Sequence, residues 1–183
     1  MDLLTGLRTR SSALKLTAPG PTREQIEQLV RAAVRAPDHG RLRPWRFVVL
    51  EGAAREKLGE EMARISLAKF PQSTPEQLDI ERRKALRAPT IIAVAARITP
   101  GRIPQVEQVN ATAAAAQNIL LAAHAMGLGA MWKTGAAAYD EGVKKMLGLE
   151  PQDHIVAFIY VGTIAAPGTV REPQIEDVLR WLD

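Results

Sequence analysis

A chain of 183 residues has about the length of one domain, and its 46% hydrophobic and 24% charged residues are typical of a globular protein rather than a disordered or fibrous one. It has no cysteine, which excludes a disulfide scaffold, a thiolate metal site and a cysteine nucleophile. Because no leader pattern and no apolar run of about 18 residues occurs, we expect a single cytoplasmic domain over residues 1–183 without a membrane partner.

The net charge is +4, from 24 basic and 20 acidic residues. A basic chain suggests a nucleic-acid partner, but only 4% of the residues are aromatic, too few for a row of base-stacking platforms, so we expect no such partner. The densest basic cluster, Arg82-Arg83-Lys84 with Arg87, directly follows three acidic residues, a pattern typical of a solvated helix face. A second cluster has only Asp38 as a nearby acid and is a candidate phosphate site. It comprises Arg31, Arg35, Arg41, Arg43 and Arg46.

The first half of the chain predicts helices around one strand. A helix begins after Thr22, with Gln25 at the spacing of a capping box, and residues 45–50 form a short β-type run. Two surface helices follow at 53–69 and 75–86.

The second half predicts the centre of the fold. Residues 89–96 are apolar on both alternating faces, which indicates a central strand covered on both sides. Residues 106–126 predict a helix that is apolar almost all round and is therefore buried by other elements or by a second subunit. The remaining predicted elements are an extended segment at 130–135, a short helix at 139–148, a strand at 154–162 and a terminal helix at 174–182. Together these elements predict a layered α+β fold in which helices flank a mixed central sheet.

The sequence lacks the motifs of several common catalytic and metal-binding sites. The histidines His39, His124 and His154 are far apart and no H-E-x-x-H or EF-hand spacing occurs, so we expect no metal site. The G-x-S-x-G, G-x-G-x-x-G and Walker patterns are also missing, which argues against the usual hydrolases and Walker-type sites. One polar segment, Arg10-Ser11-Ser12 after an N-terminal helix, combines an arginine fork with two hydroxyls and suits a dianionic phosphate.

Further polar segments stand at the ends of predicted elements, where binding sites tend to lie. In chain order the segments are Arg10-Ser11-Ser12, Arg35-Ala36-Pro37-Asp38-His39 with Arg43-Pro44-Trp45-Arg46-Phe47, Glu107 ahead of Gln117-Asn118, Gly127-Leu128-Gly129 with Trp132-Lys133-Thr134-Gly135, and Val170-Arg171-Glu172-Pro173. In this order and at these spacings they resemble the FMN-dependent nitroreductase family, in particular its short YdjA-like branch of NAD(P)H nitroreductases. The resemblance extends over nearly the whole chain.

The resemblance implies a fold, an assembly and an activity. The fold is nitroreductase-like, and the assembly is an intertwined homodimer with FMN bound at the interface. The activity is that of a ping-pong oxidoreductase: a hydride passes from NAD(P)H to FMN, and the flavin then reduces a small electron-poor acceptor such as a nitroaromatic or a quinone. Such a mechanism needs no obligatory acid or base from the protein, so we expect no catalytic residue of that kind.

The resemblance also assigns nucleotide-binding residues. Arg10, Ser11 and Ser12 correspond to the clamp for the phosphate and ribityl chain of FMN, and Arg171 resembles a second phosphate-binding arginine. The stretch that the family associates with the nicotinamide nucleotide corresponds to Ala122, Ala123, His124, Ala125, Met126 and Gly127. A helix ends there, and the negative end of a helix dipole suits a pyrophosphate poorly.

The flavin ring has its own set of implied contacts. Trp132, Lys133 and Thr134 line it from one subunit, while Arg35 and His39 reach it from the other. Hydride transfer leaves negative charge near N1 and O2 of the flavin, so a fixed cation is needed there, and Lys133 or Arg35 would supply it. Without the family context, Lys133 would be a solvated strand-end lysine, Trp132 a core residue and His39 a turn-capping histidine.

Because the sequence departs from the family pattern in two places, the resemblance does not identify the substrate. In many family members a basic residue stands two positions after the serine of the first motif. Here the residue two positions after Ser12 is Leu14, and the basic residue Lys15 comes one position later. Arg41-Leu42-Arg43 also replaces the usual Asn-x-Gln, which favours an anionic acceptor or NADPH. Two alternatives therefore stand beside the reductase: an FMN enzyme that dehydrogenates or fragments an anionic substrate, and a cofactor-free basic module that binds nucleic acid.

Overall fold

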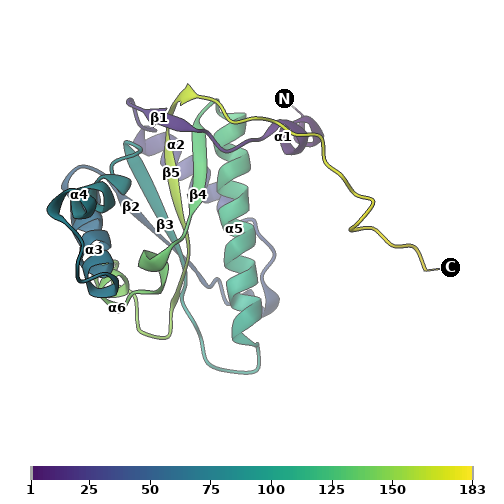
Figure 1. The fold of residues 1–183 in the computed structure, drawn as a ribbon. Coiled ribbons are helices and arrows are strands. Elements are labelled where there is room, and N and C mark those ends of the chain that lie inside the picture. Colours follow the sequence, from purple (N-terminus) through teal and green to yellow (C-terminus); the bar gives the residue numbers. More distant parts are fainter. Residues whose placement is uncertain (1, 183) are drawn as a thin grey trace.

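A central sheet lies between two groups of helices in the computed structural model, which describes residues 2–182 (Figure 1). The elements in chain order are α1 (Leu3–Thr9), β1 (Lys15–Thr17), α2 (Arg23–Ala33), η1 (His39–Arg41), β2 (Trp45–Leu50), α3 (Ala53–Lys69), α4 (Pro75–Lys84), β3 (Thr90–Ala96), α5 (Gln105–Ala125), β4 (Gly129–Lys133), η2 (Ala136–Tyr139), α6 (Glu141–Met146) and β5 (His154–Ala166). Here η marks a single 3₁₀ turn. Within these residues no helix is long and apolar enough to cross a membrane.

The sheet has the order β1-β5-β3-β2, and β4 also pairs with β5. All seven residues of β3 are buried, because helices cover both faces of this interior strand, as the double-sided apolar pattern predicted. The layered α+β architecture is confirmed. The predicted mixed pairing is wrong, however, because each of the four strand pairs that the structure describes is antiparallel.

Helices cover the two faces of the sheet with separate hydrophobic cores. One core joins α2 and α5 to the sheet and includes Leu29, Ile119 and Ile159; the other lies under α3 and α6 and includes Leu58 and Phe158. The capping box predicted for α2 is present: Thr22 and Gln25 exchange side-chain-to-backbone hydrogen bonds of 2.8 and 3.2 Å. These caps fix where α2 begins.

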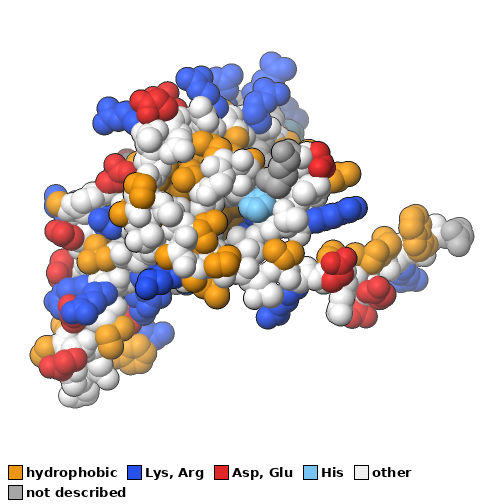
Figure 2. Space-filling model, turned by 90° about the horizontal axis from the view of Figure 1, so that it is seen from above, with side chains coloured by type: hydrophobic (Ala, Val, Ile, Leu, Met, Phe, Trp, Pro, Cys, Tyr) orange, Lys and Arg blue, Asp and Glu red, His pale blue; other side chains and the backbone are white. Residues whose placement is uncertain are grey.

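The predicted terminal helix over residues 174–182 is wrong. After β5 the chain runs away from the body as an extended arm with one turn near Asp177, and its side chains include exposed apolar groups (Figures 1 and 2). An isolated helix of nine residues is unstable in water, and none of the residues 2–182 covers the apolar side of the segment. The large apolar side chains that the arm exposes beyond residue 174 are Ile175, Val178, Leu179, Trp181 and Leu182.

Candidate functional site

Predicted phosphate-binding residues line one cavity of about 240 Å³, named here the α1–α5 cavity. It lies where the end of α1, the C-terminal end of α5, the start of β4 and the segment after β5 meet. Arg10 and Ser11 contribute to its wall, together with His124 of α5 and Gly168 of the arm. His124 thus joins the predicted clamp, whereas Ser12 and the other five residues of the predicted nicotinamide stretch are not part of the lining.

Two polar contacts join the segments that form the walls of the α1–α5 cavity. His124 Nε2 lies 2.9 Å from the hydroxyl oxygen of Thr9, and Ser11 Oγ donates to the backbone carbonyl of Gly168 at 3.4 Å. A Cβ at Gly168 would lie 2.0 Å from the carbonyl oxygen of Ser12, so only glycine lets the arm pass this closely over the clamp. Arg10 forms no ion pair with residues 2–182, which leaves its guanidinium available to an anion.

The predicted flavin-lining residues stand at the other end of β4 and face different ways. Side chains alternate along a strand, so Trp132 packs on the core beside α5 while Lys133 faces the opposite side. Lys133 is exposed and lines a small cavity of about 80 Å³. Thr134 lines a third cavity of about 270 Å³ between η2 and the α3–α4 pair. The strand therefore leads from the α1–α5 cavity to two further depressions.

The α3–α4 cavity, the one that Thr134 lines, contains residues that the sequence analysis missed. Phe70 is 57% exposed there, and Lys69 Nζ lies 5.4 Å from the centre of its ring. Lys84 also lines the cavity and donates to the Glu81 carboxylate at 2.5 Å. Sequence alone assigned Lys84 to a solvated helix face, and only the packing of α4 against α3 brings it to the wall of a cavity.

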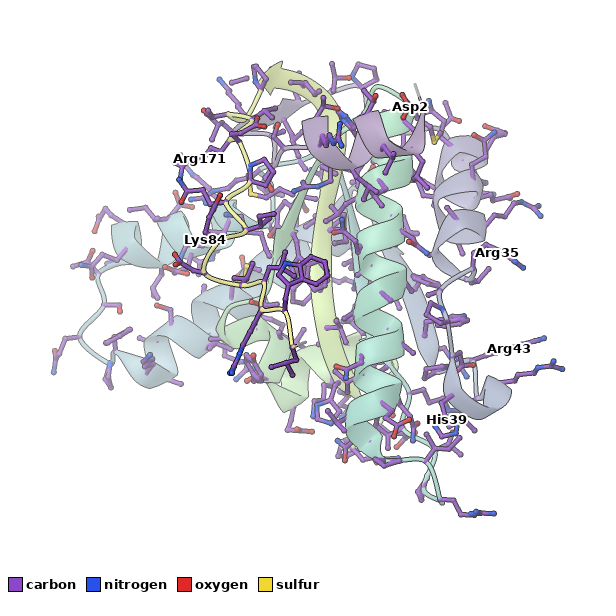
Figure 3. All side chains as sticks on the ribbon, turned by 90° about the vertical axis from the view of Figure 1, so that its right-hand side faces the viewer. Asp2, Arg35, His39, Arg43, Lys84 and Arg171 are labelled. Carbon is purple, nitrogen blue, oxygen red and sulfur yellow. The ribbon has the colours of Figure 1, made fainter. Side chains whose placement is uncertain are left out.

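Arg35 and His39 lie away from these cavities. Figure 3 shows both on one side of α5, with Lys84 and Arg171 on the other. His39 does not cap a turn: its Nδ1 lies 2.6 Å from Glu107 Oε2 at the start of α5, and both side chains are largely exposed. One chain therefore does not bring Arg35 and His39 to the residues of the predicted clamp.

The loop between Arg35 and β2 has a constrained backbone. Arg41 and Arg43 adopt φ values of 55° and 50°, in the left-handed region that side chains other than glycine rarely occupy. The Asp38 carboxylate accepts a hydrogen bond of 2.6 Å from the backbone N–H of Arg43 and so holds the loop in this shape. Backbone strain of this kind clusters at functional sites. The side chain of Arg43 points outward into solvent (Figure 3).

Tyr160 lines the same small cavity as Lys133 and is 4% exposed. Burial raises the pKa of Tyr160 to about 12, against a smaller lowering by the positive charge of Arg87. The phenol therefore keeps its proton, and is a hydrogen-bond donor, at every physiological pH.

The raised pKa of Tyr160 predicts a loss of stability at high pH. Below pH 10 the phenol is protonated in both states, but between pH 10 and about 12 the unfolded state releases the proton first, so stability falls by roughly 2–3 kcal/mol as pH rises. Urea unfolding from pH 8 to pH 11.5 measures this loss. Tyr160→Phe should flatten the dependence, and Tyr139→Phe, at a position that is 78% exposed, should leave it unchanged. Equal slopes in wild type and Tyr160→Phe would contradict the assignment.

The fold is a layered α+β architecture, and its α1–α5 cavity has in its wall an arginine, Arg10, that forms no ion pair with residues 2–182. The sequence profile of the nitroreductase family matches residues 7–163. Over 164 residues the chain is 37% identical to YdjA of Escherichia coli strain K12, named "Putative NAD(P)H nitroreductase", and the match covers 89% of this chain and 88% of YdjA. The chain belongs to the nitroreductase family.

Solved structures share the fold. A nitroreductase-like family protein from Bacillus cereus superimposes with a TM-score of 0.85 at 24% identity, covering 100% of this chain and 97% of that one. A protein from Desulfovibrio desulfuricans, solved in complex with FMN, gives a TM-score of 0.74 at 26% identity and covers 98% of this chain and 96% of its own. The nitroreductase-like architecture expected from the sequence is therefore confirmed.

Proposed function

We propose that the protein is an FMN-dependent oxidoreductase that passes electrons from NAD(P)H to a small electron-poor acceptor such as a nitroaromatic or a quinone. The observation that carries this proposal is the α1–α5 cavity, in which an unpaired arginine and a serine hydroxyl meet a closely docked arm. Family membership supports it, as do the name of YdjA and the FMN in the Desulfovibrio structure. A cytoplasmic location would supply the reduced nicotinamide nucleotide.

The residues present fit an FMN phosphate. Arg10 in the cavity wall and Arg171, three residues beyond Gly168 on the arm, supply two cations without carboxylate partners among the described residues, and a bound phosphate would take the Ser11 hydroxyl from the Gly168 carbonyl. Lys133 and the segment from Thr134 would hold the ring at the far end of β4. Bound FMN would supply the hydride-accepting chemistry, while the protein binds and orients the flavin and gives the nicotinamide and the acceptor access to one face of its ring.

A homodimer would complete this site. Arg35 and His39 lie on the opposite side of α5 from Arg171 (Figure 3), so they would act on the flavin of a second copy. The exposed apolar arm and the 62% exposed Val106 on α5 are surfaces that a second copy would cover. Within residues 122–127, His124 alone lines the α1–α5 cavity, so it would lie beside the FMN phosphate rather than the nicotinamide nucleotide.

The first experiment is a visible spectrum of the purified protein after addition of FMN and removal of the excess. We expect about one FMN per chain and bleaching of the flavin on anaerobic titration with NADH or NADPH. A protein that retains no flavin would overturn the proposal. Its arginines would then be tested against nucleic acid, whose binding weakens steeply with salt.

The strained loop favours a second candidate, in which the same FMN site serves an anionic substrate. Arg41 and Arg43 are held in left-handed backbone and their side chains are without carboxylate partners in residues 2–182. Arg43→Gln is expected to lower kcat/KM for 4-nitrobenzoate by about fivefold at low salt, the effect of one exposed charge, and to leave neutral nitrobenzene unchanged; NADPH should be affected more than NADH, which lacks the 2′-phosphate. Equal effects on charged and neutral substrates would remove the loop from substrate selection.

A further inference from the structure

His124 stands in the last turn of α5, is half-buried, and lines the α1–α5 cavity. Figure 1 shows this end of α5 beside α1 and the start of the arm. The last backbone carbonyls of a helix carry a partial negative charge, which repels an anion. A phosphate in the cavity would therefore lie next to an unfavourable helix end, unless a positive charge on His124 offset it.

The contact with Thr9 fixes which nitrogen of the His124 ring carries a hydrogen. The Thr9 hydroxyl donates its proton to the backbone carbonyl of Thr5 at 2.7 Å. Its oxygen therefore faces His124 Nε2, 2.9 Å away, as an acceptor, and Nε2–H is the donor. In a neutral imidazole the second nitrogen, Nδ1, then has a lone pair and no hydrogen. Protonation of the ring thus adds an N–H at Nδ1 together with a positive charge.

The groups that face His124 in the cavity include one cation and no acid. Arg10, just after α1, is the only other charged or titratable side chain among the lining residues. Within residues 2–182 no carboxylate forms an ion pair with His124. From β4, β5 and the arm the cavity receives the uncharged residues Gly129, Ala130, Ile164, Pro167, Gly168 and Val170.

Charged residues of the neighbouring helices stand outside the lining. The two helices α1 and α2 pack against α5, and α1 carries Arg8. The acidic side chains at the start of α1 and along α2 are Asp2, Glu24 and Glu27, and none of them lines the cavity. In the empty cavity Arg10 therefore opposes a second positive charge on the His124 ring. A phosphate dianion reverses this balance, because it attracts both cations.

We propose that His124 binds the FMN phosphate in its protonated, cationic form, so that FMN binding takes up a proton. This inference rests on the proposed FMN function. The proton comes from water and goes to Nδ1 of the ring, and no bond of the flavin changes. The imidazolium also offsets the partial negative charge at the C-terminal end of α5.

The pH range of the effect follows from the chemistry of imidazole and phosphate. An imidazole takes up its second proton near pH 6.5, and a phosphate monoester loses its second proton near pH 6. Because bound phosphate favours the imidazolium, the affinity that His124 adds is fully present below about pH 6.5 and is lost as pH rises past about 8. The phosphate itself gains a proton below about pH 6. The informative quantity is therefore the ratio of affinities between the wild type and a variant without the imidazole.

The test compares the wild type with His124→Gln, whose amide can still donate to Thr9 but cannot take up a proton. We expect His124→Gln to weaken FMN binding roughly tenfold at pH 6 and less than about twofold at pH 8.5. A tenfold effect corresponds to about half a proton taken up per FMN at pH 7, and His124→Gln should take up none. Quenching of FMN fluorescence measures the affinities on flavin-free protein. Titration calorimetry in two buffers with different ionisation enthalpies measures the protons.

Two controls separate phosphate binding from a merely structural role. Riboflavin has the ring and the ribityl chain of FMN but no phosphate, so its affinity should not differ between wild type and His124→Gln at either pH. His154→Gln removes a histidine that contacts Gln105 at the opposite end of α5, and it should take up as many protons as wild type.

The outcomes separate this inference from the proposed function. If the wild type binds FMN and His124→Gln takes up as many protons, the inference fails while the FMN proposal stands. A loss of riboflavin affinity as large as the loss of FMN affinity would show that the variant changes the shape of the cavity, and would also overturn the inference. If the wild type binds no FMN, both proposals fall together.

Discussion

Deletion of residues 174–183 is expected to convert the proposed homodimer into monomers. The deleted segment carries five exposed large apolar side chains, of which Trp181 is 79% exposed, and it keeps Arg171 in place. Loss of one buried aromatic anchor already costs an interface about 2 kcal/mol, so removal of two such arms should weaken dimerisation at least about 100-fold. Analytical ultracentrifugation over a concentration series measures the dissociation constant.

Trp181 offers a second readout of the same prediction. Docking of the arm on a partner would bury this indole, so its emission should shift to longer wavelength when the wild type is diluted below the dissociation constant. The truncated chain should unfold in urea with the stability of the wild-type monomer, because the arm beyond residue 174 covers no core of its own chain. A truncated chain that stays dimeric would show that α5 alone holds the dimer.

Gly168→Ala is expected to weaken FMN binding by about 10- to 100-fold. The new Cβ would lie 2.0 Å from the carbonyl oxygen of Ser12, whereas real Cβ contacts are essentially never under 3.0 Å, so the arm or the clamp must move. The movement would displace Gly168 and Ser11, which line the α1–α5 cavity, and the loss of one hydrogen bond from this site to a charged phosphate costs about 1.5–3 kcal/mol. Titration of FMN by fluorescence quenching measures the affinity.

The matched control for Gly168→Ala is Thr169→Ala, one residue further along the arm. Thr169 is exposed and its side chain is part of no hydrogen bond or ion pair within residues 2–182, so its truncation should leave FMN affinity unchanged. The backbone of Gly168 is not left-handed, and the expected effect therefore comes from the close approach alone. Equal affinity of Gly168→Ala and wild type would mean that the arm does not position the phosphate site.

Local sequence patterns were sufficient to predict most of the helices and strands. The capping box at Thr22 fixed the start of α2, and the apolar run of β3 identified a strand covered on both faces, because both signals depend on neighbours in the sequence. The helix predicted over 174–182 is wrong because a helix there depends on contacts outside the segment. Its apolar periodicity favours a helix, but a short helix needs a surface to pack on, and the described residues of one chain do not provide one.

For the candidate site, too, the residues that are neighbours in the sequence could be predicted and those brought together by packing could not. Arg10-Ser11-Ser12 could be predicted because an arginine and two hydroxyls in one segment suffice to suggest a phosphate site, and the structure places Arg10 and Ser11 in a cavity. Lys84 and Arg87 could not be told apart from their sequence, since both belong to one basic run. The Lys84–Glu81 pair is an i,i+3 contact within α4, whereas the packing of distant segments decided that Arg87, which has no ion-pair partner in residues 2–182, lines a cavity with Lys133.

By itself, the sequence determined the nitroreductase-like class, the order of most of the helices and strands, and a candidate phosphate-binding segment, because periodicity, caps and clustered donors are local properties. The tertiary structure decided which side chains meet. It docked Gly168 against Ser12, brought Arg87 to the cavity that Lys133 lines, and left Arg35 and His39 on the far side of α5. Those contacts depend on how distant segments pack, and the free energy of packing is shared among residues that no single stretch of sequence contains.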